Sequence, residues 1–294
     1  MSTTDVLGRL RTLIARHAGE GVTRTALPGV SVTASTTTTE PIDSMAEPAL
    51  AVVAQGAKNT VLNDRVFAYG AGQYLVVSLE LPVTGTITQA SAEEPFLAFV
   101  LRLDPAAVAA LLLETGAGAT PGPASGMAVS DAGPDLLDAV VRLLGLLEQP
   151  GDVRALAPVY QREILWRLVS GEQGATVRQI GLADSHLSHL GRAICWLRGH
   201  YDQAIRIEDL AEMSAMSVSS FHRHFRAVTE MTPIQFQKQI RLQEARARLI
   251  AQPGNVAGVG FAVGYDSPSQ FSREYRRMFG VSPGRDAAAR IRAL

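Results

Sequence analysis

The sequence of 294 residues contains one cysteine, Cys195, so an intrachain disulfide is impossible and nothing indicates an oxidising compartment. None of its apolar runs approaches the length of about eighteen residues that a membrane-spanning helix needs. The N-terminal stretch contains Asp5, Arg9 and Arg11 and has no unbroken apolar core. We therefore expect an amphipathic helix there and no signal peptide, no membrane partner, and a cytoplasmic location.

Histidine is missing from the part of the chain that is rich in β-branched residues, roughly 29–103. The six histidines lie at positions 17, 186, 189, 200, 222 and 224. A transition-metal site usually needs imidazole, and Glu80, Glu93 and Glu94 alone would make a poor one. The histidines near Cys195 lack the further ligands that zinc requires. We predict no metal, no cofactor and no catalytic residue.

The overall net charge of −1 hides an uneven distribution. From Leu190 onward, Lys238 and fourteen arginines stand against nine acidic residues, a net charge of +6, which leaves −7 for the rest of the chain. A basic part joined to an acidic part is typical of nucleic-acid binding confined to one domain.

An internal repeat lies within this basic part. Residues 217–233, SVSSFHRHFRAVTEMTP, align with residues 267–283, SPSQFSREYRRMFGVSP. At helical spacing each copy has one apolar face and one polar, cationic face. The apolar face holds Val218, Phe221, Phe225 and Val228 in the first copy, and Phe271, Tyr275 and Met278 in the second. A single copy would suit an ordinary surface helix, but solvation alone does not require the same polar face twice.

The segments before the two copies predict a short helix followed by a tight turn, so each copy is the second half of a helix-turn-helix. Gly264 suits a turn position that needs positive φ, and Pro268 suits the first helical position after the capping residue Ser267. The pairs Thr232-Pro233 and Ser282-Pro283 predict the start of two more helices.

From residue 185 the chain resembles the DNA-binding domain of the AraC/XylS family of bacterial transcription regulators. The resemblance depends on LAEMSAMSVSSFHRHFRAVTEMTPIQF, RLQEARARL and VGFAVGYDSPSQFSREYRRMFGVSP. It implies two helix-turn-helix units joined by a long helix, here 233–250, with both recognition helices in the major groove. Ala215 and Gly260 depart from the family pattern, which usually has glycine at the first position and alanine at the second.

The resemblance and the helix faces together give candidate contacts. The base-reading candidates are Ser219, His222, Arg223, Pro268, Ser269, Ser272 and Arg273. The phosphate-binding candidates are Arg226, Lys238, Arg276 and Arg277. A joining helix of eighteen residues would be about 27 Å long, and major grooves on one face of DNA recur at about 34 Å. One chain could therefore read two adjacent grooves.

The front part alternates short β patterns with Pro, Gly and Asn-Asp turn signals, which predicts an antiparallel sandwich or small barrel. Residues 59–70 read as a hairpin with Asn63 and Asp64 at its tip. Within an AraC-like regulator, this part resembles the cupin-like N-terminal domain. The fold class we predict is therefore an α+β two-domain chain with an antiparallel β cupin-like barrel, flanking helices and an all-α C-terminal domain.

Helices are predicted at 5–18, 104–115, 134–148, 152–170 and 185–203, with a flexible loop at 116–126 and a linker beginning at 171–175 and reaching residue 185. The helix 134–148 is apolar enough to be either buried or a subunit interface. Cys195 is expected to be buried. We expect domain 1–178 to sense an effector and to dimerise, and domain 185–294 to bind DNA.

The sequence thus predicts a DNA-binding transcription regulator and not an enzyme. The partners we expect are double-stranded DNA, a small-molecule effector with unknown binding residues, a second copy in a homodimer and, implied by the family, RNA polymerase. Activation is the family's usual output. Two alternatives stay open: a constitutive DNA-binding protein whose β domain only oligomerises, and a cupin-type enzyme.

Overall fold

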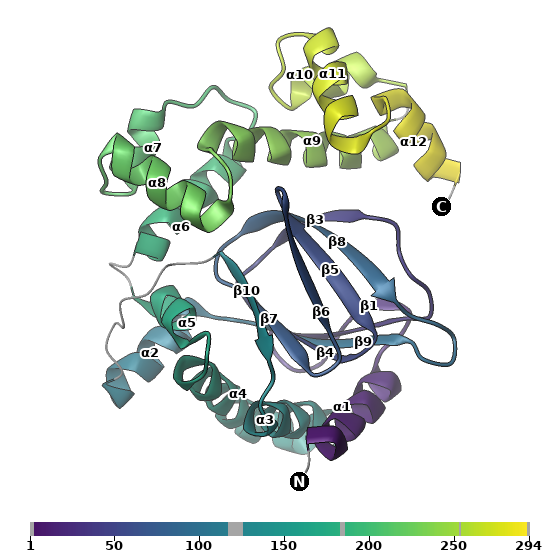
Figure 1. The fold of residues 1–294 in the computed structure, drawn as a ribbon, viewed down its shortest axis with the longest axis vertical. Helices are drawn as coiled ribbons and strands as arrows, with labels where there is room; N and C mark the ends of the chain where they lie inside the picture. Colours follow the sequence, from purple (N-terminus) through teal and green to yellow (C-terminus); the bar gives the residue numbers. More distant parts are fainter. Residues whose placement is uncertain (1–2, 117–125, 183–185, 253, 293–294) are drawn as a thin grey trace. The chain divides into compact units, whose positions relative to one another are not determined.

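The computed structural model describes residues 3–116, 126–182, 186–252 and 254–292 (Figure 1). The chain forms two compact units, Met1–Gly191 with Ala227–Glu230, and Arg192–Arg226 with Met231–Leu294. We call them the β-unit and the helical unit. The domain ranges 1–178 and 185–294, with the roles assigned to them, remain a prediction.

Two antiparallel sheets form the centre of the β-unit. The six-stranded sheet has the order β1-β2-β9-β4-β7-β10, and the four-stranded sheet has the order β3-β8-β5-β6. The strands of the larger sheet are β1 (Gly21–Arg24), β2 (Val30–Ser35), β4 (Ala49–Gln55), β7 (Gln73–Val77), β9 (Phe96–Arg102) and β10 (Met127–Asp131). Those of the smaller sheet are β3 (Ile42–Ala46), β5 (Ala57–Leu62), β6 (Arg65–Gly70) and β8 (Leu81–Gln89).

The predicted hairpin is confirmed. Strands β5 and β6 pair from Ala57↔Gly70 to Leu62↔Arg65, and Asn63 at the tip has a φ of 53°. Asparagine tolerates this left-handed conformation better than most residues. The short strands β1, β3 and β10 were not predicted, because their few residues lack a clear apolar alternation.

Helices cover one face of the larger sheet. In Figure 1, α1 (Thr3–His17), α3 (Pro134–Gly145) and α4 (Val153–Ser170) lie along that face. Alternate strand residues such as Leu50 and Val52 join one apolar core with these helices. The other face is also buried, at Val53 and Ala98 for example, as expected for two sheets packed face to face.

Two short 3-10 turns, η1 (Leu146–Glu148) and η2 (Pro150–Asp152), connect α3 to α4. Helix α3 is apolar because most of its residues are buried within the β-unit. Its residues Leu136, Leu137, Ala139, Val140, Val141, Leu143 and Leu144 are all buried in the core. The burial alternative therefore accounts for this helix, and no subunit interface is needed to explain its composition.

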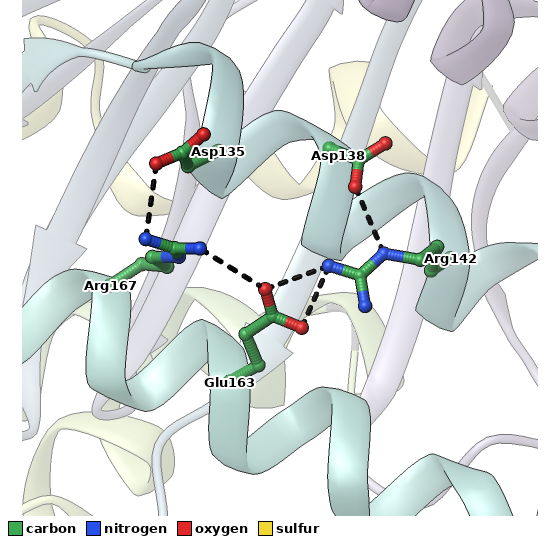
Figure 2. A network of polar contacts seen from close by, with 5 residues as sticks. All are labelled: Asp135, Asp138, Arg142, Glu163 and Arg167. Atoms are coloured by element: carbon green, nitrogen blue, oxygen red, sulfur yellow. Dashed lines mark hydrogen bonds and ion pairs between the residues drawn. The ribbon is translucent and has the colours of Figure 1, made fainter.

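A charged network ties α3 to α4 at the edge of this core (Figure 2). Glu163 accepts from Arg142 at 2.7 Å and lies 3.5 Å from Arg167, while Asp138 and Asp135 pair with the same two arginines at 2.9 and 3.0 Å. The hydrogen bond from Arg142 lowers the pKa of Glu163. The network fixes the register of the two helices, although half-exposed pairs of this kind add little stability each.

Two expectations about the β-unit need correction. The barrel is not closed, because β1 and β10 end one sheet and β3 and β6 end the other. The expected linker is partly helical, since α5 (Gly174–Gly181) buries Val177 and Ile180 in the core beside α2 (Pro105–Thr115). Most of the predicted loop 116–126 lies outside the described residues.

The helical unit contains two helix-turn-helix pairs on either side of a long helix. Its helices are α7 (Ile207–Met213), α8 (Val218–Thr229), α9 (Pro233–Ala251), α10 (Val256–Ala262), α11 (Pro268–Phe279) and α12 (Pro283–Arg292), preceded by α6 (His186–Gly199). Both helix starts that the sequence predicts at a proline, Pro233 and Pro283, are confirmed. At the first, Thr232 and Gln235 form a reciprocal capping box ahead of α9.

Cys195 is exposed, which corrects the expectation of a buried thiol. The buried face of α6 holds Leu190, Ala193, Ile194 and Leu197, and Cys195 points away from it. Among the residues that the structure describes, no helix is long and apolar enough to cross a membrane, and no three His, Cys, Asp or Glu side chains gather as a metal site would require.

Candidate nucleic-acid interface

The first helix-turn-helix consists of α7, a turn and α8. Ser217 caps α8, because its hydroxyl oxygen accepts from the backbone N–H of Ser220 at 3.3 Å. Ala215 in the turn has a φ of 51°, and Glu230 just after α8 has a φ of 59°. These are left-handed conformations that favour glycine.

The second helix-turn-helix consists of α10, a turn and α11. Ser267 caps α11 and Pro268 occupies its first turn, as predicted. Gly264 in the turn has a φ of 88°, and Gly280 ends the helix with a φ of 74°. The turn is one residue longer than in the first pair, since α7 and α8 are separated by 214–217 and α10 and α11 by 263–267.

The aromatic faces of both second helices are buried. Phe221 and Phe225 in α8 are fully buried, and the Phe225 ring meets Phe236 of α9 edge-on, with centroids 5.4 Å apart. In α11, Phe271 and Tyr275 are fully buried with centroids 5.6 Å apart. Val218 is the exception, because it lies at the first turn of α8 and is 39% exposed.

The predicted base-reading residues lie on the opposite, open face of each helix. Those that are exposed are Ser219, His222, Arg223, Pro268, Ser269 and Arg273, and Ser272 is half-buried. The Arg223 guanidinium lies 3.4 Å from the Ser220 hydroxyl, within its own helix. The fifty-residue repeat therefore brings Arg223 and Arg273 to matching positions on α8 and α11, both open to solvent.

The predicted phosphate-binding residues differ among themselves. Arg226, Arg276 and Arg277 are exposed. A hollow of about 530 Å³ on the second pair is lined by Ser272, Arg273, Arg276, Arg277 and Ser282, so predicted base-reading and phosphate-binding residues adjoin there. Lys238 is instead half-buried and ion-paired with Glu274 at 2.9 Å, which anchors α9 to α11.

Sequence reasoning missed two buried carboxylates behind the second pair. Glu274 accepts from Lys238 and from the Tyr265 hydroxyl, each at 2.9 Å. Asp286 accepts from the Tyr275 hydroxyl at 2.7 Å and from Arg246 at 2.8 Å. The available signal was a tyrosine at 275 where the first copy has phenylalanine, because a buried phenol needs a partner.

The pKa shifts follow from these contacts. Burial alone would raise the pKa of Glu274, but hydrogen bonds from Lys238 and Tyr265 outweigh burial and leave the pKa below its ordinary value. The same balance of burial against hydrogen bonds from Arg246 and Tyr275 lowers the pKa of Asp286. Burial also raises the pKa of Tyr275. Both carboxylates are therefore charged when the domain is folded at neutral pH.

A second missed feature is Arg241 on α9. Its guanidinium donates to the carbonyls of Tyr201 at 2.6 Å, Gln203 at 2.9 Å and Gly264 at 2.7 Å. Gln237, one turn earlier, donates to the first two carbonyls as well. Arg241 thus links the loop after α6 to the turn of the second pair, and it fixes that turn relative to the long helix.

Comparison with known proteins agrees with this geometry. The family described as "AraC-type transcriptional regulator N-terminus" matches residues 26–176, and "Helix-turn-helix domain" matches residues 210–288. The HTH-type transcriptional activator RhaS of Escherichia fergusonii is 33% identical over 159 residues, which cover 52% of this chain and 56% of that protein. RhaS of Salmonella arizonae is 30% identical over 156 residues, covering 51% and 56%. The matches thus span little more than half of these relatives.

Solved structures of ToxT from Vibrio cholerae share the fold. The unsaturated fatty acid-bound protein has a TM-score of 0.52 at 9% identity and covers 90% of this chain and 97% of its own. ToxT bound to (E)-4-(8-methylnaphthalen-1-yl)but-3-enoic acid has a TM-score of 0.54 at 8% identity, covering 88% and 98%. The N-terminal match alone spans half of this sequence, and with the helix-turn-helix match it shows that the chain belongs to the AraC/XylS family of transcriptional regulators.

Proposed function

We propose that the chain binds DNA in a sequence-specific way through α8 and α11 and thereby regulates transcription. The observation that carries the proposal is the repeated polar face. Arg223 and Arg273 occupy equivalent, exposed positions on two helices whose aromatic residues on the opposite face are fully buried. A helix with this construction fits the major groove.

The two sets of residues have different roles in this proposal. Arg223 and Arg273 donate to guanine O6 and N7, a bidentate pairing that guanidinium geometry favours. His222, Ser219, Pro268, Ser269 and Ser272 line the base edges, the serines through water where they are too short for direct contact. Arg226, Arg276 and Arg277 neutralise phosphates, which adds affinity and salt dependence without sequence choice.

We propose that Lys238 binds a phosphate only while it also contacts Glu274. Its ammonium already pairs with Glu274, so a phosphate would have to share it. Truncation of Lys238 should therefore reduce stability as well as affinity.

The β-unit is proposed to bind a small effector and to hold two chains together as a homodimer. Activation, with RNA polymerase as a partner, is the output we propose, because the RhaS relatives are named activators. The ToxT fold accommodates a fatty acid in one of the structures above, which is consistent with room for an effector in this architecture.

The alternative is a constitutive DNA-binding protein whose β-unit only oligomerises. It is distinguished by whether a specific small molecule raises the melting temperature of the full-length protein. Half-buried residues on the facing sides of the two sheets, described below, favour the effector.

Selection of bound sequences from random duplex DNA tests the proposal. The expected result is a site with two specified segments, one for each helix-turn-helix. A variant with both Arg223→Ala and Arg273→Ala serves as the comparison and should select no common sequence. Recovery of no enriched sequence by the unaltered protein, with or without candidate effectors, would reject sequence-specific regulation.

A further inference from the structure

The chain has only two lysines, Lys58 and Lys238, among its 27 basic residues. Lys238 is ion-paired in the helical unit. Lys58 lies in β5, opposite Tyr69 of β6 and Ile87 of β8. Tyr69 and Ile87 are 5% and 8% exposed, as is Thr60 at 5% two residues further on the same face. Lys58 therefore projects from the inner face of the four-stranded sheet.

No partner for the Lys58 ammonium exists within the described part of the chain, neither a carboxylate nor a hydrogen-bond acceptor. Burial lowers its pKa, with no opposing charge to restore it. Lys58 is half-buried by exposed area, so its ammonium keeps part of its hydration, and the missing counter-charge costs less than it would for a fully buried group.

The neighbouring residues leave room for the lysine. Gly85 of β8 faces the same side, and a Cβ atom there would lie 3.1 Å from Cε and 3.4 Å from Nζ of Lys58. The side chain therefore lies directly over Gly85. Beside it, the hydroxyls of Thr60 and Tyr69 are 3.2 Å apart. One cation and two neutral hydroxyls thus share one face of the sheet.

Packing between the two sheets is incomplete on this side. Ile42 of β3 pairs with Gly85 and is 56% exposed. On the facing side of the larger sheet, Ala51 and Val100 form a cross-strand pair in its central strands and are only half-buried. Val53 and Ala98, on the same face of these two strands, are fully buried, so the packing loosens toward Ala51 and Val100. This looser side is where a ligand would approach Lys58.

We infer that Lys58 binds the carboxylate of an effector whose remaining body is apolar, between the two sheets of the β-unit. The inference rests on the proposed effector role and names the chemical class. A single ammonium balances a single negative charge, whereas a phosphate dianion would need a second cation. Thr60 and Tyr69, whose hydroxyls bond each other, share the inner face with Lys58, and Val53, Val83 and Ile87 supply apolar surface.

The scarcity of lysine makes a direct test possible. Full-length protein labelled with ¹³C at lysine Cε gives two lysine signals, and the signal absent in Lys58→Met belongs to Lys58. The probes are octanoate, cyclohexanecarboxylate and phenylacetate, each beside its primary amide. We expect at least one acid to shift the Lys58 signal with saturation, while its amide does not and the Lys238 signal stays in place.

Three variants sharpen the test with the responding acid. Lys58→Met should weaken binding by about tenfold or more, the loss expected for one charge-assisted hydrogen bond. Lys58→Arg should retain most of the affinity, which a merely structural lysine would not explain. Asn59→Ala, on the outer face of the same strand, is the matched control and should bind normally.

The inference would be overturned if an amide bound as tightly as its acid. It would also be overturned if none of the acids shifted the Lys58 signal. These outcomes do not depend on DNA. If an operator is selected but no acid binds, the effector class is wrong and the regulator remains. If an acid binds but no operator is selected, the site remains and the regulator is wrong.

Discussion

The two helix-turn-helix pairs follow the same sequence template but are held in shape by different means. The first pair adopts its two left-handed backbone positions with Ala215 and Glu230, and the second adopts them with Gly264 and Gly280. A residue with a Cβ atom in this conformation costs about 1 kcal/mol or more. The first pair therefore carries backbone strain that the second does not.

The side-chain packing behind α8 and behind α11 also differs. Behind α8 the rings of Phe221, Phe225 and Phe236 are in contact. Behind α11 two tyrosines reach buried carboxylates, Tyr265 to Glu274 and Tyr275 to Asp286. Charged groups thus stabilise the second pair, and acid or charge-removing substitutions should affect it more than the first. A duplicated fold can keep its shape while its stabilising interactions diverge.

The largest effect is expected from Gly264→Ala. Its Cβ atom would lie 2.2 Å from the Asp202 carbonyl oxygen, at a φ that alanine rarely adopts. Backbone cannot move away as a side-chain end can, so we expect a loss of more than about 3 kcal/mol in the free energy of unfolding. Urea denaturation of the full chain measures it, and a loss below about 1 kcal/mol would contradict the turn geometry.

Asp286→Asn should have the next largest effect. The substitution keeps the shape of the side chain but removes the charge that Arg246 and Arg290 share. We expect a loss of about 2 kcal/mol in the free energy of unfolding, because Arg246 and Tyr275 would both lose the charged acceptor to which they donate. Asp266→Asn, at an exposed position, is the control. Equal stability of both variants would show that the buried network contributes nothing.

Substitution of the paired arginines should separate the two halves of the DNA site. Arg223→Ala and Arg273→Ala should each relax the preference for one base pair, in different halves, with a loss of about 1–3 kcal/mol in discrimination. Arg276→Ala should weaken binding to all sequences alike and reduce the salt slope by about one. Binding measured on single-base operator variants at several salt concentrations checks this, and an altered base preference in Arg276→Ala would reverse the assignment.

Acid should melt the second pair before the first. Glu274 and Asp286 have folded pKa values below their ordinary 4.5 and 3.8. A depressed carboxyl pKa stabilises the fold above the ordinary value, and that stability is lost as the pH falls through the folded value. Amide signals of α11 should therefore disappear below about pH 4 while those of α8 persist. In Asp286→Asn the pH dependence should be weaker, and simultaneous loss of both helices would argue against separate stabilisation.

The smallest expected effect is a gain in the free energy of unfolding. Ala215→Gly removes the Cβ atom from a left-handed position, and the added flexibility of the unfolded chain offsets part of the benefit. We expect a net stabilisation of about 0.5 kcal/mol, with a higher melting temperature and unchanged DNA sequence preference. Destabilisation would mean that the turn at Ala215 is not strained.

Much of the helical unit was predictable because its signals are local. Serine caps, proline at the first helical position and an apolar face act within one or two turns, so α8, α9, α11 and α12 begin where the sequence predicts. The hairpin at Asn63 is equally local. The failures involve contacts between distant segments: the open sheets, the packing of α5, and the side of α6 on which Cys195 lies.

The sequence by itself determined the family, the positions of α8 and α11 and the polar faces they expose, because helical periodicity and capping operate over a few residues. Only the tertiary structure decided that Asp286 is buried against Tyr275, that Arg241 joins three distant carbonyls, and that Lys58 lies on the inner face of a sheet with no partner among the described residues. These properties arise from strand register and from contacts across 11 to 40 positions of the chain, which no local pattern encodes.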